Sequence, residues 1–221
     1  MGEIMRQTLL DLLMPPGHEA REKKIYGVVA GIVTNNEDPD GLGRVKIRFP
    51  WLSEDNESWW ARIAAPMAGK EHGAYFLPEV DDEVLVAFEH GDVNFPYVLG
   101  ALWNGEDKPP AKNDDGKNNI RVIKSRNGHI IRLDDSNGAE KIELIDKTGK
   151  NSIVIDTSAN TVTVKADGDI TLESAQGKVV IKGQSVEVQS AAQDVKVEAK
   201  ANMDLKAGAQ LNVKGTAVNI N

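Results

Sequence analysis

Pairs of aliphatic residues, two positions apart, recur along the second half of the chain. The first members of ten such pairs follow one another at intervals of 11, 9, 8, 9, 7, 9, 8, 8 and 7 residues. Side chains two positions apart share one face of a β-strand, so the pattern predicts ten short strands joined by polar turns. The pairs are Ile142/Leu144, Ile153/Ile155, Val162/Val164, Ile170/Leu172, Val179/Ile181, Val186/Val188, Val195/Val197, Met203/Leu205, Leu211/Val213 and Val218/Ile220.

Two inward side chains per strand do not enclose a core within one chain, because a single-chain solenoid usually needs about 20 residues per coil. Three chains wound round a common axis supply the missing faces. We therefore expect an intertwined triple-stranded β-helix, or β-prism, in a homotrimer, with the ten pairs at its axis and the strand edges paired between chains. Strands about 4.8 Å apart would stack into a shaft of roughly 50 Å. A solenoid adhesin with longer coils is the alternative, and the short, even spacing disfavours it.

Five strand-like segments separated by Gly or Pro turns precede the repeats. Five short strands in one region of this size predict a small closed barrel such as the OB-fold, and the fold class is all-β. The segments are Val28–Val33, Arg44–Phe49, Trp59–Ala65, Glu83–Glu89 and Tyr97–Leu102.

The polar and apolar positions divide the chain into four parts. Residues 1–24 form an N-terminal arm or short helix, and residues 25–103 form the OB-fold domain. Residues 104–119 are polar and rich in turn formers, which indicates a linker. The shaft occupies residues 120–221 and begins with a hairpin signalled by Asn127-Gly128.

Charged side chains of the second barrel strand are candidate contacts with other chains. Arg44, Lys46 and Arg48 alternate with aliphatic residues, which places three cations on one solvated face. The acidic run 81–83 is a candidate partner for them, within or between protomers, although exposed pairs contribute only ~0–1 kcal/mol each.

Two apolar features are further candidates. Trp59 and Trp60 are adjacent and face opposite sides of a strand, so we expect one in the core and the other against a neighbouring chain. Residues 4–14 are mostly apolar and end at a Pro-Pro-Gly stop. This segment either covers its own domain or docks on a neighbouring protein, for which Leu9, Leu10 and Leu13 are the candidate side chains.

Composition separates the same two halves. All eleven aromatic residues lie between Tyr26 and Trp103, so the shaft must bury itself through aliphatic side chains alone. Residues 1–119 carry 12 Lys/Arg and 21 Asp/Glu, whereas residues 120–221 carry 14 and 13. The acidic first half repels phosphate, which argues against a nucleic-acid partner. We expect synthesis in the cytoplasm without a signal peptide, because the N-terminus lacks a continuous apolar core.

No pattern of catalytic or ligand-binding residues stands out. The acidic clusters at residues 81–83 and 89–92 are interpreted as solvated turn acids. There is no nucleophile elbow, phosphate-binding loop or HExxH motif, and a chain without cysteine has no thiolate ligands. We therefore expect no catalytic residue, no cofactor, no metal and no enzyme activity.

Three motifs carry a resemblance to a known family. DPDGLGRVKIRFPW, PEVDDEVLVAFEHGD and PYVLGALWN occur in this order, and the region resembles phage baseplate assembly protein V and the valine-glycine repeat (VgrG) spikes of type VI secretion. The resemblance implies a structural central spike of a contractile injection machine, in which the OB domain joins a trimeric shaft to a hub protein at the tail tube. Arg44, Arg48, Trp59, Trp60 and the three arm leucines are then candidate contacts with the hub or another protomer.

Departures from the family variants sharpen this expectation. The 16-residue linker leaves no room for a lysozyme domain, and about 24 residues before the barrel leave none for a fused hub. The C-terminal end lacks the His-x-His motif of metal-bearing tips, so we expect a separate PAAR-type tip protein. The expected location is a phage or phage-like tail baseplate that pierces a target cell envelope. The alternative function is an OB-fold module that binds glycan or single-stranded nucleic acid on a β-repeat stalk.

Overall fold

The computed structural model describes residues 24–52 and 57–220, and their regular structure is β except for one 3-10 turn, η1 (Glu89–Gly91). The chain divides into two units, Met1–Lys165 and Ala166–Asn221. The all-β fold class is confirmed for this part of the chain. The predicted contact residues Leu9, Leu10 and Leu13 lie outside the described residues.

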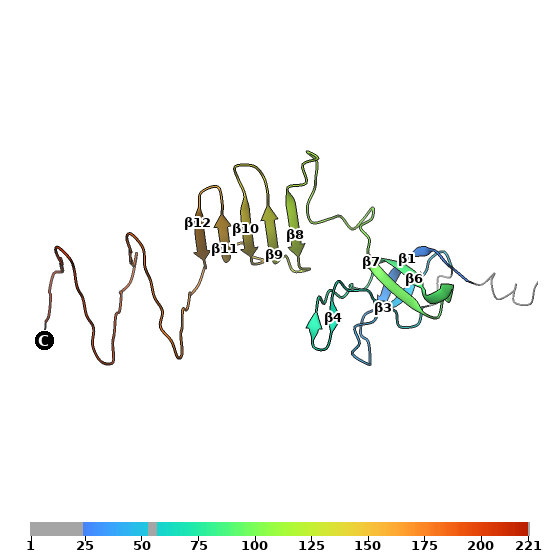
Figure 1. Ribbon diagram of the computed structural model, residues 1–221, viewed down its shortest axis with the longest axis horizontal. Helices are drawn as coiled ribbons and strands as arrows, with labels where there is room; N and C mark the ends of the chain where they lie inside the picture. The colour runs from blue at the N-terminus through green and yellow to red at the C-terminus, as the bar shows by residue number, and fades with distance from the viewer. Residues whose placement is uncertain (1–23, 53–56, 221) are drawn as a thin grey trace, which may run out of the picture. The chain divides into compact units, whose positions relative to one another are not determined.

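A five-stranded sheet forms the first folded element (Figure 1). Its strand order is β2-β1-β6-β7-β3, and only the β3–β7 pair is parallel. The strands are β1 (Val28–Asn35), β2 (Lys46–Arg48), β3 (Arg62–Ile63), β6 (Glu83–Phe88) and β7 (Pro96–Ala101). All five predicted segments therefore contain a strand, although those at 44–49 and 59–65 are shorter than expected.

Two backbone bridges join the edges of this sheet. The Val45 N–H donates to the Ala61 carbonyl at 3.1 Å, and the Ala61 N–H donates back at 2.7 Å. A second bridge pairs Arg48 with Glu57. These bridges connect the β2 and β3 sides and curl the sheet towards a barrel, consistent with the OB-fold. A small hairpin, β4 (Ala68–Gly69) and β5 (His72–Gly73), lies between β3 and β6.

The barrel core is built from alternating positions of its strands. β6 shows the pattern most clearly, because Val84, Val86 and Phe88 are buried while the residues between them are half-buried. Phe88 also packs edge-to-face on Phe49, with ring centroids 5.5 Å apart. The buried hydrophobic cluster consists of Val33, Val45, Ile47, Phe49, Ala61, Val84, Val86, Phe88 and Val98.

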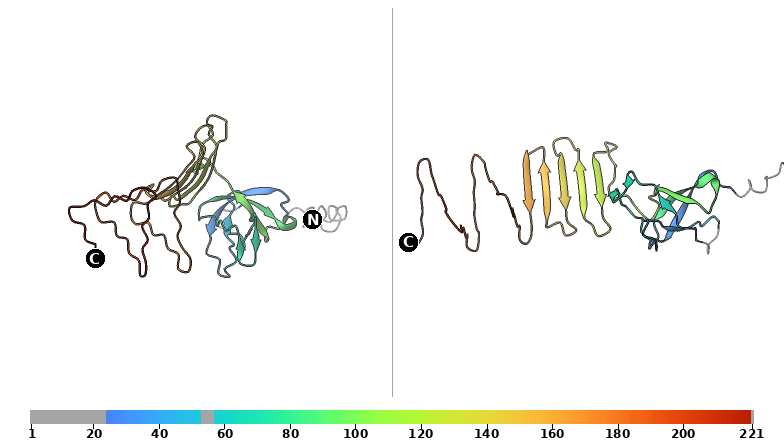
Figure 2. Two further views of the ribbon diagram at one scale, coloured as in Figure 1. Left: turned by 60° about the vertical axis from the view of Figure 1, so that its left-hand side comes forward. Right: turned by 60° about the horizontal axis from the view of Figure 1, so that its bottom comes forward.

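A second five-stranded sheet follows the linker (Figure 2). Each strand is antiparallel to the next one in sequence, in the order β12-β11-β10-β9-β8. The hairpin predicted at Asn127-Gly128 is confirmed, and it joins the first two strands. The strands are β8 (Ile120–Lys124), β9 (Ile130–Asp134), β10 (Lys141–Ile145), β11 (Ser152–Asp156) and β12 (Thr161–Lys165).

This sheet corrects one expectation about the repeats. β10, β11 and β12 contain the first three of the ten aliphatic pairs, and they pair with one another within the chain instead of between chains. The connections 146–151 and 157–160 reverse the chain because Gly149 and Asn160 adopt positive φ angles of 72° and 54°. The remaining seven pairs lie in residues 166–220, where no strand is assigned. Their pairing between chains stays a prediction.

Candidate assembly surfaces

One face of the second sheet carries an unbroken row of aliphatic side chains from edge to edge. Antiparallel register aligns Leu144 with Ile131 on one side and with Ile153 on the other, and the same row continues to Val164. The side chains of this face are 41–69% exposed, although an isolated sheet face of this kind is normally buried. The face consists of Ile123, Ile131, Leu133, Ile142, Leu144, Ile153, Ile155, Val162 and Val164.

The seven later pairs, which the sequence places at a buried axis, are open to solvent within the single chain. The first member of each pair is 46–58% exposed, and these residues are Ile170, Val179, Val186, Val195, Met203, Leu211 and Val218. The second members are more exposed still. They are 65–75% exposed at Leu172, Ile181, Val188, Val197, Leu205 and Val213, and 91% exposed at Ile220.

The exposure of these pairs differs from the expected core for a physical reason. Residues 166–220 form no sheet of their own, so one chain offers each pair a single side and no opposing surface. Regular aliphatic side chains that find no cover within their own chain form an exposed apolar surface of a kind that is rare on monomeric proteins. The structure thus brings the first three pairs onto one sheet face and leaves the other seven uncovered. Burial of all ten pairs at a trimer axis stays a prediction.

The opposite face of the second sheet carries cross-strand ion pairs. Arg132 Nη2 lies 2.5 Å from Glu143 Oε2, and Glu143 is only 8% exposed. Lys141 Nζ lies 3.5 Å from Asp156 Oδ2. Each pair joins residues that stand directly opposite in the register, so the pairs favour this register over a one-residue slip.

Arg132→Ala is expected to destabilise the second sheet by about 1.5–3 kcal/mol, because the buried Glu143 loses its charged partner. Arg121→Ala is the matched control. It removes the exposed Arg121–Asp135 pair, whose side chains are 56% and 61% exposed, and should cost about 0–1 kcal/mol. Chemical denaturation of the purified variants measures the difference. Equal losses would show that Glu143 does not depend on Arg132.

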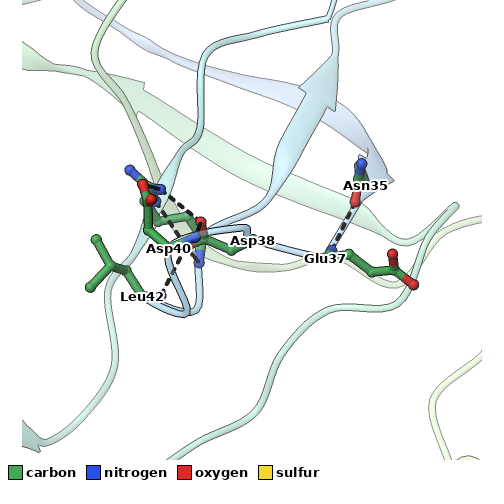
Figure 3. A network of polar contacts seen from close by, with 6 residues as sticks. Asn35, Glu37, Asp38, Asp40 and Leu42 are labelled. Carbon is green, nitrogen blue, oxygen red and sulfur yellow. Dashed lines mark hydrogen bonds and ion pairs between the residues drawn. The ribbon is translucent and has the colours of Figure 1, made fainter.

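The turn before β2 is organised around one carboxylate (Figure 3). Asp38 accepts hydrogen bonds from the backbone N–H groups of Asp40, Leu42 and Arg44 at 3.0–3.2 Å. The Arg44 guanidinium binds the same carboxylate at two points, 2.7 and 2.8 Å. Gly41 and Gly43 adopt φ angles of 66° and 68°, which glycine reaches without strain, and so allow the tight turn.

The same contacts shift the pKa values of Asp38 and Arg44. Hydrogen bonding to Arg44 holds the pKa of Asp38 well below its ordinary value of 3.8, and the backbone N–H groups add to this effect. The Arg44 pKa rises in return, through Asp38 first and Asp40 second. A carboxylate whose pKa falls on folding stabilises the folded state above its unfolded pKa, and this stabilisation is lost as the pH falls through the lowered value.

Asp38→Asn should therefore lower the thermal midpoint of the barrel at neutral pH, and the gap from the unmodified chain should close only at pH values below 3.8. Asp40→Asn is the matched control, because Asp40 also contacts Arg44 but its side chain is 66% exposed against 3% for Asp38. Thermal melts across an acidic pH series test this. A gap that is the same at every pH would contradict the assignment.

Arg44, Lys46 and Arg48 are half-buried side chains that alternate with buried residues, as predicted. Their expected pairing with the acidic run 81–83 inside the chain is wrong. Arg44 binds Asp38 and Asp40, and Lys46 binds Glu57 at 2.9 Å. Arg44 thus pairs with the turn that precedes it, and Lys46 with a residue of the neighbouring segment.

The two adjacent tryptophans also differ from expectation, because neither belongs to the buried core. Trp60 is half-buried, and its ring lies under Arg44 and Lys46 at 5.9 and 5.7 Å from the cationic groups. Trp59 is 68% exposed and donates its indole N–H to Asn94 Oδ1 at 3.2 Å. Trp59 thus remains a candidate contact for another protein.

The sequence patterns did not predict a second exposed apolar surface. Leu42, Met67, Tyr75 and Phe76 are 56–75% exposed and line a groove of about 630 Å³ beside the β4–β5 hairpin. These residues lie in loops, where no strand or helix period marks them. The only sequence signal was the adjacent aromatic pair Tyr75-Phe76, which follows a glycine turn.

Comparison with known proteins identifies the barrel. Residues 29–103 match the family model of the type VI secretion system and phage-baseplate injector OB domain. The barrel is therefore an OB domain of the phage-baseplate and VgrG-like spike family. Among the described residues, no helix is long and apolar enough to cross a membrane.

Curated spike proteins support the same assignment. The type VI secretion system spike protein VgrG5 of Pseudomonas aeruginosa is 31% identical over 140 residues, or 58% of this chain and 18% of its own length. VgrG1c of the same organism is 33% identical over 114 residues, covering 47% and 16%. VgrG3 of Vibrio cholerae is 30% identical over 113 residues, covering 48% and 11%. This chain therefore spans under a fifth of the length of these three relatives.

Proposed function

We propose that the chain is the homotrimeric central spike of a contractile injection machine, with its repeats forming a triple-stranded β-helix. The observation that carries this proposal is the uncovered aliphatic face of β8–β12 together with the seven exposed pairs that follow it. Three copies provide three such faces, and a shared axis covers all of them at once. Hydrophobic burial of this kind is the dominant favourable term in association.

The shaft works mechanically in this proposal. Contraction elsewhere in the machine supplies the force, and the trimer transmits it to the target cell envelope. A stiff backbone is sufficient for this task, so the function needs no catalytic residue, cofactor or bound metal. The ion pairs Arg132–Glu143 and Lys141–Asp156 support stiffness, because they fix the register of neighbouring strands.

The barrel provides the connection to the rest of the particle. In the proposed assembly a separate hub protein at the tail tube binds the OB domain, and a PAAR-type tip protein covers the far end of the shaft. Trp59 and the groove beside the β4–β5 hairpin are the exposed apolar contacts available for the hub. The excess of acidic residues in this half disfavours a nucleic-acid partner.

The purified full-length chain is expected to have three times the single-chain mass of 24.0 kDa. Size-exclusion chromatography with light scattering measures this mass directly. The trimer should also resist SDS at room temperature, because an intertwined axis cannot separate without unfolding. A stable folded monomer at micromolar concentration would contradict the proposal.

Ile155→Lys is expected to abolish the soluble trimer, because three copies would bury three charges at the axis. Val154→Lys is the matched control on the same strand. Val154 lies on the opposite face and stands across from Glu143, where a cation is tolerated. Mass in solution distinguishes the variants, and normal trimers from Ile155→Lys would show that this face is not inward.

A further inference from the structure

Three Asn-Gly dipeptides occur in the chain, at Asn104, Asn127 and Asn137. Asparagine is thermally labile, and the dipeptide is prone to deamidation because glycine has no Cβ to keep its nitrogen away from the preceding side-chain amide. The three dipeptides share this chemistry, so their surroundings in the folded chain decide which of them reacts.

Asn104 is held by both ends of its side-chain amide. Its Oδ1 accepts the N–H groups of Glu106 and Asp107 at 2.8 and 2.7 Å, and its Nδ2 donates to Glu83 Oε2 at 3.0 Å. Ring closure onto the next nitrogen would require this amide to leave all three contacts. The folded barrel therefore protects Asn104.

Asn127 is protected through the Gly128 nitrogen, which would attack its side-chain amide in the deamidation reaction. The Gly128 N–H donates to the Ser125 carbonyl at 2.9 Å, which closes the β8–β9 turn. The reaction would have to break this bond to free the nitrogen, because an N–H group that donates within a turn is held in place.

Asn137 has neither form of protection. It lies in the exposed β9–β10 connection, where the Ala139 N–H donates to Ser136 at 2.8 Å and Gly138 has a φ of 78°. Within residues 24–52 and 57–220, no hydrogen bond is found to the Asn137 amide or from the Gly138 N–H. Both reacting groups are thus available in the folded chain.

We propose that Asn137 is a site of spontaneous deamidation in the native protein. The Gly138 nitrogen gives up its proton to solvent and forms a bond to Asn137 Cγ, and the Cγ–Nδ2 bond breaks to release ammonia. Water then opens the resulting succinimide at either carbonyl, which leaves an aspartyl or an isoaspartyl residue at position 137. Water is the only co-reactant.

The change has two physical consequences at this turn. A carboxylate replaces a neutral amide in a connection that already carries Asp135 and Glu140, so like charges accumulate. The isoaspartyl product also adds a methylene group to the main chain between β9 and β10. This connection joins the two strands that pair Arg132 with Glu143, so we expect the longer main chain to disturb their register.

Peptide mapping of the full-length chain tests the proposal after incubation in mildly alkaline buffer and rapid digestion at mildly acidic pH. The expected result is that the Asn137 peptide converts from amide to acid several-fold faster than the Asn104 and Asn127 peptides. Enzymatic methylation of isoaspartate should label the same peptide.

Incubation in denaturant provides the internal control, because unfolding removes both forms of protection and should bring the three rates together. Asn137→Gln should remove the fast phase of ammonia release and leave the thermal melt unchanged. Equal rates in the folded chain, a faster reaction at either other site, or an intact Asn137 while the denatured chain reacts would each overturn the proposal.

Discussion

Each short strand of the shaft repeats offers two aliphatic side chains on one face, and a strand of five residues has no way to cover them itself. In the second sheet the backbone hydrogen bonds are satisfied between neighbouring strands, so its polar backbone is already paired. The aliphatic face remains about half-exposed. In this sheet a single chain therefore pairs its backbone groups but leaves its aliphatic side chains uncovered.

The barrel meets the same demands within a single chain. Its strands curve until the edges bridge at Val45 and Ala61, so one continuous wall encloses the cluster around Ile47, Val84 and Val86. Aromatic rings such as Phe49 and Phe88 fill the remaining volume. The chain therefore places its aromatic residues where a closed core needs bulk, and it uses branched aliphatics where a narrow surface must repeat.

The buried positions of the barrel strands could be predicted from the sequence, because alternation of polar and apolar residues follows directly from burial of one strand face. Val45, Ile47 and Phe49 alternate with cations, and the structure buries the three apolar residues. The partners of individual side chains could not be predicted in the same way. Asp38 rather than the acidic run 81–83 binds Arg44, because the turn folds back on itself and brings its carboxylate within 2.7 Å. Trp60 shows the same limit, since its ring lies beneath Arg44 and Lys46 at the surface, an environment that two separate segments of the chain create together.

The spacing of the aliphatic pairs shortens where strand pairing within the chain ends. The shortest return in the second sheet joins β11 to β12 and uses strands of five residues and a connection of four. The first intervals, 11 and 9 residues, equal or exceed this length, whereas most of the later intervals are 7 or 8. Between residues 166 and 220 the structure contains no strand pairing within the chain. The proposed trimer supplies partners for this backbone, because the strand edges of one chain then pair with those of another.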